Sequence, residues 1–170
     1  MSGAIEEKML DDKAVKEAEK SMAEKPIEKK PTEQRIELGI LKGIRQAEED
    51  IVIAIEKALE VGEYPKNGRD KLEASQFKNL VRVADTTESP EVVKNFLRYQ
   101  VGRERKWGRG EKSLAEHIVK DIDGLLKKRA GEIASEAKST ETRRIHMELI
   151  RRYLGYGSRR LKYLDAMQEG

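Results

Sequence analysis

Apolar residues recur at steps of three and four along most of the chain, which is the spacing of one face of an α-helix. The clearest stripe covers about 32–61 and consists of Ile36, Ile40, Ile44, Ala47, Ile51, Ile55 and Leu59. Gly62 follows where a left-handed helix cap belongs, and Tyr64-Pro65 ends the element. The pattern predicts one long amphipathic helix.

Three more helices are predicted by the same spacing and by their start signals. The first covers about 72–85, and the second begins after Ser89-Pro90-Glu91, where Ser can cap, Pro fits the first turn and Glu opposes the helix dipole. Its apolar stripe is Val93, Phe96, Leu97 and Val101. The third opens on a capping box of Ser113 and Glu116 and extends through Ile133.

A last helical region begins near Thr140, and the pair Gly155 and Gly157 predicts a hinge before a short terminal helix. No stretch alternates with period two for long enough to form a strand. We therefore predict an all-α fold, a single bundle of five to six helices over residues 34–170.

Residues 1–33 differ in character from the rest. They carry seven Lys and nine Asp or Glu, few large apolar residues, and two prolines, Pro26 and Pro31. This composition predicts a disordered, flexible charged tail. The alternative is a short amphipathic helix, with Ile5, Met9 and Val15 on one side, that forms on a partner.

The composition indicates the cellular compartment that we expect for the chain. It has no cysteine among 170 residues, which fits a reducing compartment and removes thiol chemistry. No apolar run approaches the roughly 18 residues of a membrane span. The first residues lack a basic region followed by an apolar one, so no secretory signal is indicated. We expect a soluble, cytoplasmic protein without membrane contact.

Candidate chemistry is sparse. His117 and His146 lie in different helices, and neither has a partner at metal-ligand spacing. The segment 110–113 is similar to the end of a phosphate-binding loop, but Glu111 separates the glycine from the lysine and no strand precedes it. We predict no catalytic residue, no metal site and no cofactor. An enzyme assembled from scattered Glu, Arg and Tyr remains the alternative.

Charge is distributed unevenly along the chain. The stretch 98–109 has five basic residues and one acid, and the stretch 143–162 has seven basic residues and one acid. Their net charges are +4 and +6, whereas the whole chain carries only +3. The cations are Arg98, Arg103, Arg105, Lys106, Arg109, Arg143, Arg144, Arg151, Arg152, Arg159, Arg160 and Lys162.

Ten of these twelve cations are arginine, whose planar fork suits phosphate oxygens. Aromatic residues are interleaved with them, and Trp107 and Tyr156 are candidates for stacking on bases. We interpret the two stretches as a nucleic-acid-binding surface, for RNA more than for DNA. Two alternatives stay open: the aromatics pack into the core, and the patches bind acidic proteins, which would make the chain a helical adaptor.

The segment 72–80, Leu-Glu-Ala-Ser-Gln-Phe-Lys-Asn-Leu, resembles the Leu-x-x-Ser-Gln-apolar-basic element of the small helical subunit of type III CRISPR effector complexes. The resemblance implies a non-catalytic role in antiviral defence, within a ribonucleoprotein complex. It also implies contacts with other subunits, including copies of the chain itself. Ser75, Gln76 and Lys78 would be structural or contact residues.

Overall fold

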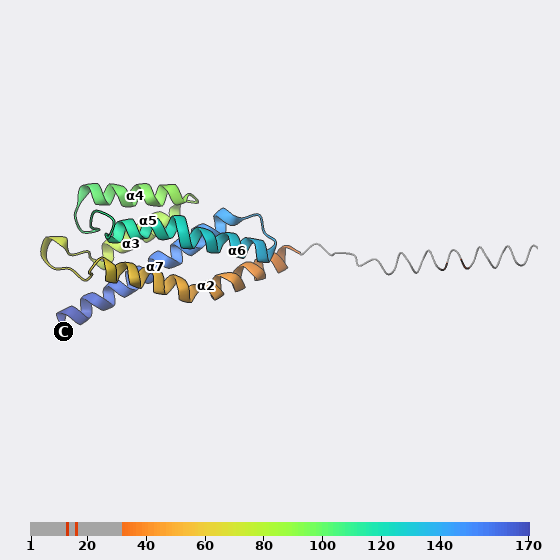
Figure 1. The fold of residues 1–170 in the computed structure, drawn as a ribbon, viewed down its shortest axis with the longest axis horizontal. Helices are drawn as coiled ribbons and strands as arrows, with labels where there is room; N and C mark the ends of the chain where they lie inside the picture. Colours follow the sequence, from red (N-terminus) through yellow and green to blue (C-terminus); the bar gives the residue numbers. More distant parts are fainter. Residues whose placement is uncertain (1–12, 14–15, 17–31) are drawn as a thin grey trace, which may run out of the picture. The chain divides into compact units, whose positions relative to one another are not determined.

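The computed structural model of the chain describes residues 13, 16 and 32–170 (Figure 1). Residues 32–170 form, in chain order, α2 (Glu33–Val61), a 3-10 turn (Gly68–Asp70), α3 (Ala74–Thr86), α4 (Pro90–Arg103), α5 (Leu114–Asp121), a π-helical segment (Ile122–Leu126), α6 (Lys127–Ala137) and α7 (Thr142–Glu169). No strand occurs among the described residues, and the predicted all-α bundle of five to six helices is confirmed there. The predicted tail lies outside the described residues, except for residues 13, 16, 32 and 33.

The long first helix is confirmed with its predicted bounds, but its end is built differently. Thr32 caps α2, because its Oγ1 accepts a hydrogen bond from the Arg35 amide at 3.3 Å. Gly62 is right-handed, with φ −73°, and the left-handed residue is Glu63, with φ 62°. A Cβ on Gly62 would lie 2.9 Å from the Tyr64 ring. This glycine is therefore required by a close contact and not by a left-handed cap.

The predicted hinge at Gly155 and Gly157 is wrong, because α7 is one continuous helix of 28 residues. A Cβ at Gly157 would lie 2.6 Å from Phe77 of α3 and 2.7 Å from Ile55 of α2. Gly157 instead lets α7 pack closely against both helices. Gly43 does the same for α2 and α6, since its Cβ would lie 2.8 Å from Ile133.

The helix predicted from Ser113 onward is interrupted by the π-helical segment. Its start is confirmed, because Ser113 Oγ accepts a hydrogen bond from the Glu116 amide at 3.2 Å. In the π segment, the Ile122 carbonyl lies 2.7 Å from Nε2 of the buried His146 of α7. A π turn leaves a carbonyl without its usual helix donor. The imidazole N–H donates to Ile122, so the second of the two histidines has a structural partner.

Burial lowers the pKa of His146 below its ordinary value of 6.5, despite the opposing effect of the Ile122 carbonyl. Because the unfolded chain binds this proton more readily, folding stability should fall as pH drops below about 6.5, by up to about 1.4 kcal/mol per pH unit. Urea unfolding at pH 7.5 and pH 5.5 measures the difference. His146→Gln keeps a donor for Ile122 and should reduce that difference. Equal pH sensitivity of the wild type and His146→Gln would contradict the assignment.

Helix α4 packs on the bundle through Val93 and Leu97, which are both buried. Phe96, predicted at the centre of its apolar stripe, is only partly buried and lies 6.4 Å from the Tyr99 ring. The buried Lys94 takes part in the packing, because its Nζ pairs with Glu91 at 2.6 Å and with Asp123 of the π segment at 2.7 Å. No helix among the described residues is both long enough and apolar enough to cross a membrane.

Candidate nucleic-acid interface

Three arginines of α7, predicted as nucleic-acid contacts, pair with glutamates of α2. Arg144 lies 2.8 Å from Glu37, Arg152 lies 2.5 Å from Glu48, and Arg160 lies 3.9 Å from Glu56. Both helices run in the same direction along this row of pairs, as Figure 1 also shows. The partners stand about a hundred positions apart in the sequence, so α2 pairs with three of the seven cations of the basic stretch 143–162.

Arg151 binds the other neighbour of α7, the end of α3. Its Nε donates to the Ala84 carbonyl at 2.9 Å, and its Nη2 donates to the Thr87 carbonyl at 3.0 Å and to Glu88 at 2.9 Å. The last carbonyls of a helix lack partners within the helix, so an arginine there caps the helix and opposes its dipole. These contacts hold Arg151 against the end of α3, and its contact with nucleic acid stays a prediction.

In the stretch 98–109, Trp107 lies in the core and not on the surface. Its side chain is only 1% exposed and lies against the Phe77 ring, with the centroids 5.2 Å apart. A base cannot stack on a ring that is buried in the core. The open alternative for Trp107, that it packs into the core, is the one that the structure supports.

The loop around Trp107 is held in place by its own backbone. The Trp107 carbonyl accepts from the Ala115 amide at 3.1 Å, and the Lys106 carbonyl accepts from the Tyr64 hydroxyl. Gly108 has φ 76°, and a Cβ there would lie 2.9 Å from Ser113. Arg109 closes the end of α4 by donating to the Val101 carbonyl at 3.2 Å. Lys106 lies 4.0 Å from Glu104. The loop around Trp107 is therefore fixed to the bundle by hydrogen bonds to its backbone carbonyls.

The remaining predicted cations are exposed. None of them has a carboxylate within 4.0 Å among the described residues: Arg98, Arg103, Arg105, Arg143, Arg159 and Lys162. Tyr156, the second predicted stacking residue, is half-buried, and the Arg159 guanidinium lies 6.0 Å from its ring centroid. The structure does not bring all six cations together, because Arg143 lies at the start of α7 and Arg159 and Lys162 lie toward its end.

Helix α3 supplies a face that charge counting alone had not revealed. Its buried side consists of Phe77, Leu80 and Ala84. The opposite side, which we call the α3 face, is exposed and consists of Ser75, Lys78, Asn79 and Arg82. These four follow the i, i+3, i+4, i+7 spacing of one helix face. Hydroxyl, amide and cationic groups in a row can all bond phosphate oxygens.

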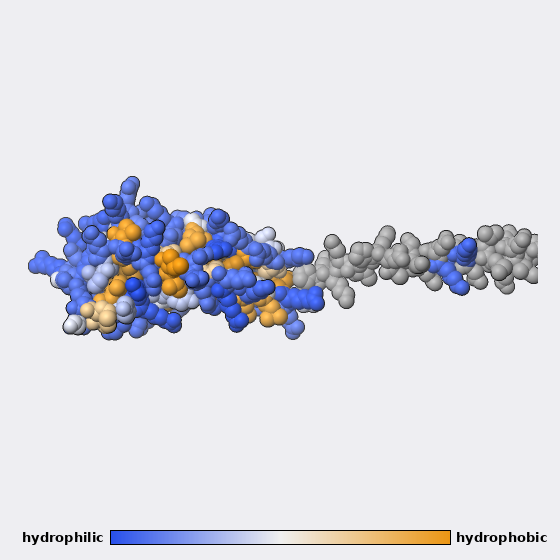
Figure 2. All heavy atoms as spheres, turned by 60° about the horizontal axis from the view of Figure 1, so that its bottom comes forward, coloured by the Kyte–Doolittle hydropathy of each residue, from blue (hydrophilic) through white to orange (hydrophobic). Residues whose placement is uncertain are grey.

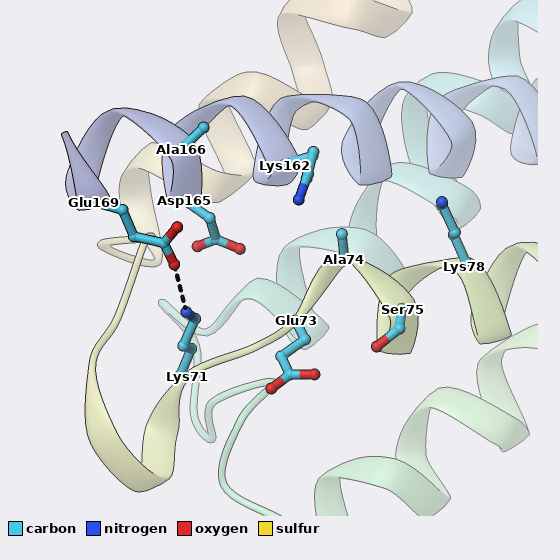
Figure 3. A pocket seen from close by; sticks show the side chains of 9 residues that line it. All are labelled: Lys71, Glu73, Ala74, Ser75, Lys78, Lys162, Asp165, Ala166 and Glu169. Carbon is cyan, nitrogen blue, oxygen red and sulfur yellow. Dashed lines mark hydrogen bonds and ion pairs between the residues drawn. The ribbon is translucent and has the colours of Figure 1, made fainter.

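Helices α4 and α7 extend the α3 face on both sides. Toward α4, a groove is lined by Gln76, Asn79, Gln100, Arg103 and Glu104. Toward α7, a second groove is lined by Ser75, Lys78 and Lys162, among others. Figure 3 shows Lys162 pointing from α7 toward α3 and Lys78 pointing from α3 toward α7. Arg159 lies one turn before Lys162 on α7 and is exposed.

Five exposed cations lie on α3, α4 and α7, of which Lys78 and Lys162 line the groove toward α7 and Arg103 lines the groove toward α4: Lys78, Arg82, Arg103, Arg159 and Lys162. Only the last three lie in the predicted basic stretches. Lys78 was implied by the resemblance alone, and Arg82 was missed because it is an isolated cation in the sequence. Its helical spacing from Ser75 and Lys78 is the signal that could have identified it.

Acidic side chains limit this surface at the start of α3. Figure 3 shows Glu73, Asp165 and Glu169 beside Lys71, which pairs with Glu169 at 3.4 Å. Burial raises the pKa of Asp165, and Glu169 acts in the same direction. A phosphate would be repelled at this end, and the exposed Asp85 and Glu88 limit the surface at the other end of α3.

Among residues 13, 16 and 32–170, no group of three or more His, Asp or Glu side chains could hold a metal ion. Comparisons of the chain with models of protein families, with curated proteins and with solved structures found no match.

Proposed function

We propose that the chain is a non-catalytic subunit that binds nucleic acid, RNA in preference to DNA, through the α3 face and its flanking cations. The observation that carries the proposal is the row of exposed cations on α3, α4 and α7 that have no carboxylate within 4.0 Å among the described residues. Unpaired cations retain their full attraction for phosphate, whereas Arg144, Arg152 and Arg160 of α7 are paired with glutamates of α2.

The resemblance to the small subunit of type III CRISPR effector complexes adds support, because it falls on this same helix. Within the segment 72–80, Leu72, Phe77 and Leu80 are buried, and Ser75 and Lys78 are exposed. The segment therefore combines a core-forming side with a contact side. We propose assembly into a ribonucleoprotein complex on this basis, with the backbone of the nucleic acid as the recognised feature.

The proposal predicts steeply salt-dependent binding without strong sequence preference. Four to five phosphate contacts on a single strand correspond to a log–log slope of about −3. Affinity for a labelled single-stranded RNA should then fall by roughly two orders of magnitude between about 50 and 200 mM salt. Fluorescence anisotropy measures both quantities, with single-stranded DNA and double-stranded RNA as comparisons.

Two outcomes would overturn the proposal. If no oligonucleotide binds saturably even at low salt, the alternative is favoured, namely a helical adaptor for acidic proteins. Binding with a slope near zero would exclude a phosphate interface. Because a subunit that acts in many copies can bind weakly alone, the titration should extend to high micromolar protein.

A further inference from the structure

Helix α4 lies at one edge of the bundle in Figure 1, and its outer side carries aromatic residues. Four residues share that side at the i, i+4, i+7, i+11 spacing of one helix face, and we call them the α4 stripe: Val92, Phe96, Tyr99 and Arg103. Tyr99 is 57% exposed and Val92 is 46% exposed. The Phe96 ring is partly buried, and its centroid lies 6.4 Å from that of Tyr99. The buried residues of α4 lie on its other side.

Tyr99 is the aromatic residue of the basic stretch 98–109 that is available for stacking. The other aromatic residue of this stretch, Trp107, is buried. A tyrosine ring at the surface offers a flat apolar face, while its hydroxyl group stays in contact with water. Tyr99 and the neighbouring Phe96 therefore form a small platform of the kind on which bases stack.

The exposed apolar side chains of α2 offer no such platform. Figure 2 views the molecule from the side on which α2 lies, and orange apolar side chains interrupt its hydrophilic surface. The exposed ones of α2, such as Leu38 and Ile53, are aliphatic, and α2 contains no aromatic residue. Base stacking needs a flat ring, so the α4 stripe differs in kind from the apolar surface of α2.

The charges around Tyr99 favour an anionic partner. Arg98 precedes it and Arg103 follows one turn later, and both arginines are exposed without a carboxylate within 4.0 Å among the described residues. The acid of α4, Glu91, lies at the start of the helix and pairs with Lys94 at 2.6 Å. A partner that combines flat apolar rings with regularly spaced negative charges is a single-stranded nucleic acid.

A groove joins the α4 stripe to the α3 face. Amide side chains from both helices line it, Asn79 from the α3 face and Gln100 from α4. The acid in this groove, Glu104, is engaged, because it accepts a hydrogen bond from Gln76 at 3.2 Å. A strand whose phosphates follow the cations of α3 therefore brings its bases toward Gln100 and Tyr99, which are neighbours on α4.

We infer, on the basis of the proposed function, that the α4 stripe binds the bases of a single strand and that one base stacks on Tyr99. The cations of α3, α4 and α7 hold the phosphates of the same strand. In a duplex, neighbouring base pairs cover the faces of the bases, so a tyrosine on a rigid helix cannot reach them. The stripe therefore selects single-stranded over double-stranded nucleic acid.

Replacing Tyr99 with Ala in the full-length protein tests the stacking. Affinity for single-stranded RNA should fall about five- to a hundredfold, which corresponds to one lost contact between a base and an aromatic ring. The salt slope should stay unchanged because no charge is removed, and affinity for double-stranded RNA should stay within about twofold of the wild-type value. Tyr99→Phe keeps the ring and should bind single-stranded RNA within about threefold of the wild type.

Tyr163→Ala is the matched control. Tyr163 is 52% exposed, and its ring centroid lies 5.1 Å from the guanidinium of Arg160, which pairs with Glu56 of α2. Its removal should leave the affinities for single- and double-stranded RNA unchanged. Circular dichroism of each variant checks that the fold is retained, as expected for exposed side chains.

Three outcomes would contradict the inference. Equal affinity of the wild type and Tyr99→Ala for single-stranded RNA would overturn it while the proposed function stands, and a protein contact would then be the use of the stripe. Equal losses on single and double strands would overturn it as well, because Tyr99 would then not act on bases. A wild type that binds no oligonucleotide would overturn the proposed function and the stacking together.

Discussion

Replacing Trp107 with Ala should lower the free energy of unfolding by about 3–5 kcal/mol, the usual cost of removing a large buried aromatic. The side chain is 1% exposed and packs against Phe77, which is itself buried between α3 and Gly157 of α7. For a unit of this size the loss corresponds to a fall in Tm of roughly 10–15 °C. Thermal unfolding followed by circular dichroism measures it.

Trp107→Phe is the matched control for this prediction. The indole Nε1 of Trp107 is buried without a hydrogen-bond acceptor among the described residues. Phe keeps an aromatic ring and removes that unpaired N–H, so it should cost about 1.5 kcal/mol or less. If Trp107→Ala instead left stability unchanged and weakened RNA binding, the ring would be a stacking residue and its place in the core would be wrong.

Replacing Arg144, Arg151 and Arg152 together with Ala should destabilise the protein by about 2–4 kcal/mol. Arg151 accounts for most of the loss, because its guanidinium bonds two backbone carbonyls at the end of α3. Arg144 and Arg152 make half-exposed pairs with α2, which contribute roughly 0.2–1 kcal/mol each. Urea unfolding at neutral pH measures the total.

High salt provides a control, because it screens the ion pairs and should reduce the effect of losing Arg144 and Arg152 more than the effect of losing Arg151. The salt slope of RNA binding should stay within about one unit of the wild-type value, since these side chains face acids of the same chain. An unchanged unfolding midpoint together with a flatter binding slope would contradict this account and restore the three arginines as phosphate contacts.

The helices could be predicted from sequence because each has an apolar stripe whose period depends only on local geometry. Residues 33–61 illustrate this, since the stripe from Ile36 to Leu59 gives both the length and the buried side of α2. The start at Ser113 was equally local, because a capping serine acts on an amide three residues away.

Features that depend on a neighbouring helix could not be predicted in this way. Gly157 has the composition of a hinge, but it is a contact point because Phe77 and Ile55 approach it. The π segment at residues 122–126 depends in part on a histidine of α7, 24 positions further along. Neither the contacts of Gly157 nor the bond between His146 and Ile122 can be predicted when each segment of the sequence is considered separately.

The same reasoning explains why the basic stretches predicted the interface only in part. Counting charge along the chain assigns Arg144, Arg152 and Arg160 to a free surface, but folding places Glu37, Glu48 and Glu56 beside them. Lys78 and Arg82 stand among neutral and acidic neighbours in the sequence, and their helix then presents them together. Net charge in space is set by which helices are adjacent.

The most direct test of the α3 interface is the salt dependence of RNA binding by a variant with Lys78→Ala, Arg82→Ala and Lys162→Ala. Three lost phosphate contacts should flatten the log–log slope by about two. The free energy of unfolding should stay within about 1 kcal/mol of the wild-type value. Lys120→Ala, Lys127→Ala and Lys128→Ala remove the same charge from α5 and α6 and should leave the slope unchanged. Equal slopes for the wild type and the α3 variant, or equal flattening in both variants, would contradict an interface on α3.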